Sequence, residues 1–314
     1  MASDRYGLTP RDQLALDAAK LYYTAGLSQQ EISDLLHVSR PHISKLVAAA
    51  RERGFVRMQV VDPRESDADL IDAVRRRFDL TEVRLVMPVN NRPMGHHQAL
   101  GDAAAEMLST FVGPHDVVGF WWSGLLHSFA RSAVRANLRP REFVQLNGTD
   151  PYEAVETILE AFSSQVAVPV HLYPHPILHE DLTARLAAAE DQISRSIVAL
   201  QSACDVAIFS PETAEESDLW DSPLMTDPDR TSILNSSVGQ ICGRFIDAEG
   251  RIVAPSLSQR TLGPTLTDLR KIKRTVLVGG GHATIPIIRA ALGSRYANHL
   301  VTDIDTATAL AQGK

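Results

Sequence analysis

Side chains suited to contact with DNA lie close together near the N-terminus. Arg40, His42, Ser44 and Lys45 fall within one short stretch that begins after Ser39. Lysine and arginine neutralise phosphates, and arginine also makes paired hydrogen bonds with guanine in the major groove. Ser28 and Gln29 precede this stretch by about ten residues. The predicted DNA contacts are Ser28, Gln29, Ser39, Arg40, His42, Ser44 and Lys45.

Three helical patterns would position these side chains. The first is predicted over residues 10–25, and the second begins at Ser28, which forms a capping box with Glu31. His37 then occupies a turn where left-handed backbone is expected, and histidine tolerates that conformation better than most residues. A third helix is predicted over residues 40–53. Two short helices joined by a tight turn, the second with a basic outer face, predict a helix-turn-helix.

The apolar spacing in these helices predicts which side chains face inward. Ser39 is expected to cap the third helix, and Arg51 and Arg53 are expected to contact phosphate or solvent. The alternative is an ordinary small helical bundle that docks on the rest of the chain or on another protein, but the cap, turn and basic face agree with a DNA-binding role. The predicted core positions are Leu14, Ala18, Leu21, Tyr22, Ile32, Leu35, Leu36, Ile43, Leu46, Val47 and Ala50.

Charge and composition indicate two domains. The chain has 314 residues and a net charge of −7, but residues 1–60 carry eight Lys/Arg against six Asp/Glu. A mildly basic head on an acidic body is compatible with DNA binding. A short strand-like run over 56–61 precedes a polar segment. We therefore predict a winged-helix-like helix-turn-helix domain over 1–60 and a second domain over 61–314.

The chain is expected to be cytoplasmic. It begins without a signal peptide, and it has no uninterrupted run of about 18 apolar residues that could span a membrane. Its two cysteines, Cys204 and Cys242, do not form a disulfide framework.

Apolar runs and helical segments alternate beyond residue 60. This alternation predicts an α/β fold with a doubly wound, mainly parallel sheet. The predicted strands are 82–87, 116–122, 142–146, 168–172, 206–209 and 275–278. The predicted helices include 97–111, 151–162, 183–203 and 284–292.

Four loops that follow predicted strands could bind a ligand. In doubly wound sheets, ligands lie beyond the carboxyl ends of the strands. The loops are 121–124, 146–150, 210–213 and 279–284, and they carry two tryptophans and several glycines. A glycine-rich turn that opens a helix offers backbone N–H groups to an anion or a hydroxyl, and indole rings pack on sugars. Each glycine could instead be only steric, and each tryptophan could be core.

Three histidines have a spacing that would suit a metal on a helix. His171, His175 and His179 are four residues apart. Pro174 and Pro176 interrupt the run and prevent the helix, so no metal site is predicted.

Several motifs resemble the SorC family of sugar-responsive regulators. Residues 22–60 are similar to its N-terminal module, which has an aromatic–x–x–Gly–x–Ser-Gln–x–Glu-Ile core followed by Ser39-Arg40. Residues 238–250 are similar to its Gly–Asp–Ile–x–Gly–x–Phe–Phe–Asp–x–x–Gly motif, and residues 276–310 to its closing sequence. The resemblance covers nearly the whole chain. It implies a sensor domain that resembles sugar-phosphate isomerases in fold, an effector that is a phosphorylated sugar or related metabolite, and dimers or tetramers.

The loops and the family resemblance together predict a DNA-binding regulator that represses a carbohydrate catabolic operon. Its predicted ligands are operator DNA and a sugar, sugar-phosphate or polyol effector. No cofactor is predicted. The alternative is a sugar-phosphate isomerase-like enzyme with an appended head. His282 and Asp303 could then act as acid and base, but none of the five lysines lies in a candidate loop. The predicted effector contacts are Trp122, Ser123, Gly124, Asn147, Gly148, Gln240, Asp247, Gly280, Gly281, His282 and Thr284.

Departures from the family pattern bear on the effector. Gln240 replaces the usual Asp, Ser123 replaces a Gly, Leu125 replaces a common Thr, and Thr284 replaces a frequent Lys. The lost cation and hydroxyl would suit a phosphate, whereas the Gln240 amide can both donate to and accept from a hydroxyl. We therefore expect an unphosphorylated sugar or polyol.

Overall fold

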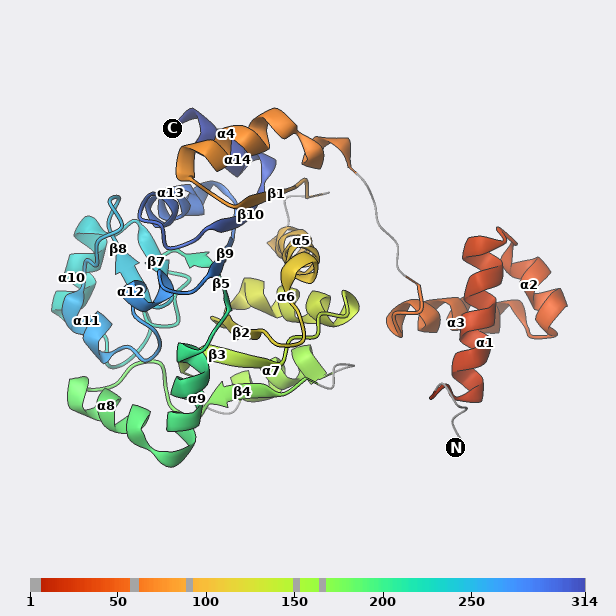
Figure 1. Ribbon diagram of the computed structural model, residues 1–314, viewed down its shortest axis with the longest axis horizontal. Helices are drawn as coiled ribbons and strands as arrows, with labels where there is room; N and C mark the ends of the chain where they lie inside the picture. Colours follow the sequence, from red (N-terminus) through yellow and green to blue (C-terminus); the bar gives the residue numbers. More distant parts are fainter. Residues whose placement is uncertain (1–6, 57–61, 89–92, 149–152, 164–167, 314) are drawn as a thin grey trace. The chain divides into compact units, whose positions relative to one another are not determined.

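The computed structural model describes residues 7–56, 62–88, 93–148, 153–163 and 168–313. It consists of two compact units, residues 1–61 and 62–314 (Figure 1). The predicted strand-like run over 56–61 lies almost wholly outside the described residues. No helix in the described part of the chain is long and apolar enough to cross a membrane.

The N-terminal unit is a small helical domain with the predicted turn. It contains α1 (Pro10–Ala19), a π-helical turn η1 (Lys20–Thr24), α2 (Gln29–Leu36) and α3 (Arg40–Glu52). The Ser28–Glu31 capping box is present at the start of α2. His37 adopts left-handed backbone with φ 54° and ψ 40°, which ends α2 as predicted.

Two of the predicted core positions in this unit are wrong. The π-helical turn inserts an extra residue into the helical repeat, so Tyr23 packs on the core and Tyr22 is 36% exposed. Leu35 is 58% exposed. The short helix α2 packs on the core through Ile32, which is fully buried, and Leu36, which is partly buried.

The second unit is built on a seven-stranded sheet whose pairings are all parallel, in the order β1-β10-β9-β5-β2-β3-β4. The six predicted strands are confirmed, and β10 is a seventh that the apolar pattern did not reveal. The strands are β1 (Glu82–Val86), β2 (Val117–Phe120), β3 (Glu142–Gly148), β4 (Val170–Tyr173), β5 (Val206–Phe209), β9 (Arg274–Val278) and β10 (His299–Asp303).

Helices cover both faces of this sheet, which explains why its strands are nearly continuous apolar runs. Along β5, Val206 and Ile208 belong to one core, and Ala207 and Phe209 belong to the other. One core includes α5 (Pro93–Phe111), α6 (Gly124–Arg135) and α7 (Glu153–Ser163). The other includes α4 (Ala68–Phe78), α9 (Gln192–Ser202), α13 (Ile285–Gly293) and α14 (Ile304–Gln312).

The long helix predicted over 183–203 is two helices, α8 (Leu182–Glu190) and α9. Asp191 has extended backbone, with ψ 162°, and its side chain caps α9 by accepting from the N–H groups of Ile193 and Ser194 at 2.8 and 3.1 Å. Aspartate favours such a cap over a helix interior. The break changes the direction of the chain beside β4.

A small antiparallel sheet also escaped prediction, because strands of two or three residues have no readable alternation. Its strands are β6 (Pro211–Glu212), β7 (Gly239–Ile241) and β8 (Arg244–Ile246). It packs with three short helices, which are α10 (Asp227–Ser236), α11 (Pro255–Arg260) and α12 (Leu266–Leu269).

Candidate functional site

The exposed face of α3 presents the predicted DNA contacts. Arg40, His42, Ser44 and Lys45 are all exposed, while Ile43 between them is fully buried. Leu46, Val47 and Ala50 are buried as predicted. The helical period thus separates a core face from a basic face, and the basic face begins at the first turn of α3, where a recognition helix contacts bases.

Two details of the N-terminal unit differ from the expectations. Ser39 occupies the N-cap position of α3, but its side chain makes no capping hydrogen bond within the described residues. The expected cap by the Ser39 hydroxyl is therefore wrong. Arg53 forms an ion pair with the buried Asp12 of α1 at 2.9 Å. Arg53 therefore joins α3 to α1 and is not simply a phosphate or solvent contact. Ser33 supports the turn by donating to the carbonyl of Val38 at 2.6 Å.

The strand order of the large sheet reverses between β2 and β5, and two predicted loops meet there. The hydroxyls of Ser123, after β2, and Ser210, after β5, lie 2.7 Å apart and are both buried. One strand further along, the Asn147 side chain accepts from the N–H of Trp122 at 2.9 Å and donates to its carbonyl at 3.3 Å. A reversal of this kind is where doubly wound folds bind ligands.

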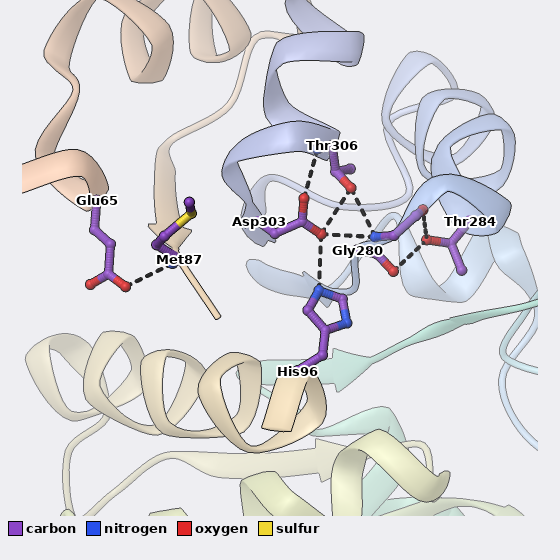
Figure 2. A network of polar contacts seen from close by, with 8 residues as sticks. Glu65, Met87, His96, Gly280, Thr284, Asp303 and Thr306 are labelled. Atoms are coloured by element: carbon purple, nitrogen blue, oxygen red, sulfur yellow. Dashed lines mark hydrogen bonds and ion pairs between the residues drawn. The ribbon is translucent and has the colours of Figure 1, made fainter. Parts of the chain in front are cut away.

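The glycine-rich loop after β9 is held by a polar network from three other elements (Figure 2). Asp303, at the end of β10, accepts from the Gly281 N–H at 2.8 Å and contacts His96 Nε2 of α5 at 3.0 Å. A Cβ on Gly280 would lie 2.0 Å from that carboxylate oxygen, so any other residue here would displace Asp303 from this network. Thr284 donates to the carbonyls of Gly280 and Gly281. The Gly281 N–H therefore already donates to Asp303 and Thr306. The neighbouring His282 is exposed.

Glu212 and Gln240 form a cross-strand pair beside this loop. The Gln240 amide donates to the Glu212 carboxyl and, at 3.2 Å, to Ser217 Oγ. Gln240 is 3% exposed, and its Oε1 has no hydrogen-bond partner among the described residues. Burial, followed by the nearby carboxylates of Asp218 and Glu216, raises the pKa of Glu212 to about 8. At neutral pH this carboxyl is therefore mostly protonated, and the pair is uncharged.

The sequence interpretation missed a buried arginine on the other face of the β7–β8 hairpin. Arg244 of β8 is 2% exposed, and Arg185 of α8 lies close enough to lower its pKa further after burial has done so. The charge of Arg185 also lowers the pKa of His179, and it opposes the rise that burial causes in the pKa of Tyr173, at the end of β4. Arg244 lies within the family motif at residues 238–250, whereas nothing in the sequence distinguishes Arg185 from a solvent-facing cation on a helix.

The remaining predicted effector residues are dispersed. Gly124 opens α6, with open space around it, whereas a Cβ on Gly148 would lie 2.5 Å from the His175 carbonyl oxygen. Trp122 is half-buried against Phe120 and His127. The Asp247 carboxylate is occupied within its own turn by the N–H groups of Glu249 and Arg251, next to Ser294 at the end of α13. The structure does not bring Asp247 to the carboxyl edge of the sheet.

The three evenly spaced histidines do not converge. His171 contacts Glu142 at 2.8 Å and His175 contacts Asp191 at 2.5 Å, whereas His179 Nε2 has no hydrogen-bond partner among the residues described. Within the described residues, no group of three His, Cys, Asp or Glu side chains could hold a metal ion.

A helix-turn-helix unit with an exposed basic recognition helix, joined to a doubly wound α/β unit, defines a ligand-responsive DNA-binding regulator. Residues 62–312 match the family described as "Putative sugar-binding domain". The chain is 30% identical over 309 residues to the deoxyribonucleoside regulator of Bacillus subtilis, covering 96% of this chain and 97% of that protein. It is 26% identical over 316 residues to the transcriptional regulator LsrR of Escherichia coli K12, covering 98% and 97%.

Solved structures agree with this class. The full-length sorbitol operon regulator SorC of Klebsiella pneumoniae superposes with a TM-score of 0.69 at 22% identity, over 97% of this chain and 100% of that chain. A domain of a possible sugar-binding transcriptional regulator from Arthrobacter aurescens gives 0.66 at 21% identity, over 80% and 100%. The chain belongs to the SorC family of sugar-responsive transcriptional regulators.

Proposed function

We propose that this protein represses a carbohydrate catabolic operon in the cytoplasm, as a homodimer or homotetramer whose α3 helices read DNA half-sites. The exposed first two turns of α3 support this proposal, because Arg40, His42, Ser44 and Lys45 project from them with no ion pair among the described residues. Closed assembly would set the spacing of the half-sites.

Arg40→Ala tests the reading role. Loss of one paired contact to a base costs about 1–3 kcal/mol, so we expect specific affinity to fall by roughly 5- to 150-fold. Fluorescence anisotropy on a duplex selected with the wild-type protein would measure it, and the melting temperature should not change because Arg40 is exposed. Arg51→Ala, on the same helix, is the control and should have a smaller effect. Equal affinity of Arg40→Ala and wild type would remove Arg40 from the recognition surface.

For the effector, we propose an uncharged sugar or polyol at the carboxyl edge of the sheet, near the reversal between β2 and β5. The Glu212–Gln240 pair is the observation that carries this. Gln240 Oε1 is buried without a hydrogen-bond partner in the part of the chain that the structure describes, and a ligand hydroxyl could donate to it. Glu212 has carboxylates nearby and, within the described residues, forms no ion pair with a cation. An anion placed here would therefore be repelled.

Binding, and not catalysis, is the proposed role of this edge. Isomerase chemistry needs a carboxylate free to act as a base. Asp303 is instead held by His96, Gly281 and Thr306. Lys271 and Lys273 precede β9 and so lie toward the amino end of that strand. Effector binding would favour one arrangement of the heads and change DNA affinity by linkage.

Calorimetric titration of the full chain with pairs of sugars, polyols and their phosphates tests the effector class. We expect the unphosphorylated member of a pair to bind more tightly, and we expect it to weaken the complex with the selected duplex. Glu212→Gln should keep this affinity, because an amide reproduces the neutral acid, and Glu212→Ala should lose about tenfold. Tighter binding of the phosphorylated member would overturn the uncharged-effector proposal.

A further inference from the structure

We propose that Glu65 is a positioning residue that couples the glycine-rich loop after β9 to the DNA-binding unit. The coupling runs through Asp303, at the end of β10, and Met87, which directly follows β1 (Figure 2). This proposal rests on the DNA-binding function proposed above, but it does not depend on the chemistry of the effector.

The first argument is the position of Glu65 in the chain. Glu65 belongs to a 3₁₀ turn, η2 (Pro63–Ser66), which is the first described element after the N-terminal unit. Hydrogen bonds hold the turn on both sides. Asp62 accepts from the Arg64 N–H at 2.9 Å before it, and Asp67 caps α4 after it. A shift of η2 therefore moves the point from which the chain leads back to the head.

The second argument is the contact that Glu65 makes with the end of an edge strand. Its Oε1 accepts from the Met87 N–H at 2.7 Å, and the Glu65 side chain is half-buried there. Among the described strands, β1 pairs only with β10, and the register places Val86 opposite Asp303. Met87 thus follows the position at which β1 meets the carboxylate that holds the glycine-rich loop.

The third argument is that Asp303 connects the loop to the elements next to η2. Its carboxylate accepts from the Gly281 N–H at 2.8 Å, and it also caps α14 by accepting from the Thr306 N–H at 2.7 Å. Helix α14 in turn packs beside α4, where Arg77 donates to the Ala311 carbonyl at 3.1 Å. A displacement of Asp303 therefore reaches η2 along β1 and along α14 and α4.

The hydrogen bond between Glu65 and Met87 is not needed to form either element that it joins. Asp62 and Asp67 supply the caps on the two sides of η2. Strand β1 completes its register with β10 at Val86, one residue before the contact. The bond therefore links two elements that have their own support, so it can change when the loop changes, without unfolding either of them.

A double-mutant cycle in DNA affinity tests this link without any effector. Gly280→Ala places a Cβ 2.0 Å from an Asp303 carboxylate oxygen and so displaces that carboxylate, and Glu65→Ala removes the acceptor of the Met87 N–H. Fluorescence anisotropy of the full chain on the selected duplex should show that each variant binds about 2- to 30-fold more weakly. Because both changes break the same link, the double variant should lose less affinity than the product of the two single losses.

Two further variants separate coupling from simple loss of structure or charge. Glu65→Gln keeps an oxygen that accepts from the Met87 N–H, and it should retain wild-type DNA affinity. Glu106→Ala removes an exposed glutamate of α5 that forms no ion pair in the part of the chain described, and it should also bind as the wild type does. If Gly280→Ala does not fold, His96→Ala removes a different contact of Asp303, at 3.0 Å, and replaces it in the cycle.

Hydrogen exchange provides a readout that needs no DNA. In Gly280→Ala and in His96→Ala, the Met87 amide should exchange severalfold faster than in the wild type, although neither substitution touches η2 or β1. Glu65→Ala should produce the same increase directly, whereas Glu106→Ala should not. A purely local role for Glu65 predicts faster exchange in Glu65→Ala alone.

The results divide as follows. Less than additive losses of DNA affinity, together with faster exchange at Met87 in Gly280→Ala, support the coupling role of Glu65. Additive losses, or wild-type DNA affinity in Gly280→Ala, would overturn it. Failure of the wild type to select any duplex would instead defeat the proposed DNA-binding function, and exchange at Met87 would still decide whether the loop and η2 are linked.

Discussion

The two faces of the β7–β8 hairpin bury polar groups in different charge states. The register pairs Gln240 with Phe245 and Ile241 with Arg244, so the Gln240 and Arg244 side chains leave opposite faces. On one face, Glu212 keeps a proton and stays neutral beside Gln240. On the other, Arg244 keeps its charge and is surrounded by carbonyl oxygens.

The difference follows from the chemistry of the two groups. A carboxyl group can become neutral within the physiological pH range when burial raises its pKa, whereas burial lowers the pKa of Arg244 only to about 10. A buried arginine must therefore find acceptors or an anion. One short hairpin thus holds a neutral amide–carboxyl pair on one side and a buried guanidinium on the other, because side chains alternate along a strand.

The largest effect should come from removing the buried charge. Arg244→Met leaves the carbonyls of Thr261 and Gly263 without their donor. We expect a loss of about 2–4 kcal/mol of unfolding free energy, seen as a lower melting temperature in calorimetry. The control is Arg251→Ala, which removes a 73% exposed side chain from a surface ion pair and should cost under about 1 kcal/mol. Equal stability of the two variants would show that Arg244 does not hold this segment.

A smaller effect is expected on the opposite face. Gln240→Asp removes the amide donor and places a second carboxyl against Glu212, which should cost about 2 kcal/mol. Adding Glu212→Gln restores an amide–carboxyl pair with the partners exchanged. The double variant should therefore recover part of the loss, and a double-mutant cycle from urea unfolding would measure the coupling. Purely additive effects would mean that the two side chains do not stabilise each other.

Local signals explain what could be predicted. The Ser28–Glu31 capping box and the His37 turn involve residues within one helical turn of each other, so spacing alone sufficed. The six predicted strands are apolar because the helices on both faces bury them. In contrast, the π-helical turn that exposes Tyr22 has no marker in the residue pattern.

The candidate ligand sites depend on long-range contacts, and there prediction failed more often. Asp191 looked like an ordinary helix residue, and only the fold shows that it separates α8 from α9 and caps the second helix. Asp247 matched a family motif, yet it serves the turn that contains it. Ser123 and Ser210 are 87 residues apart, and their contact follows from the strand order and not from either loop.

The smallest effect concerns the proton on Glu212. Its pKa in the folded protein is raised to about 8, from an ordinary value of 4.5. Below pH 4.5 both states are protonated, and this contribution to stability is fully present. Between about pH 4.5 and 8 the unfolded chain releases the proton while the folded chain keeps it, so the contribution falls as pH rises.

Glu212→Gln removes this titration. The unfolding free energy of the wild type should therefore fall relative to this variant by about 1 kcal/mol between pH 5 and pH 8, a value reduced because Glu212 is partly exposed. Urea unfolding at several pH values would measure the difference. Glu215→Gln, an exposed carboxyl in the same loop, is the control and should follow the wild-type curve. Parallel curves for wild type and Glu212→Gln would mean that Glu212 is ionised in the folded state, and that the two faces of the hairpin do not differ in the way they handle charge.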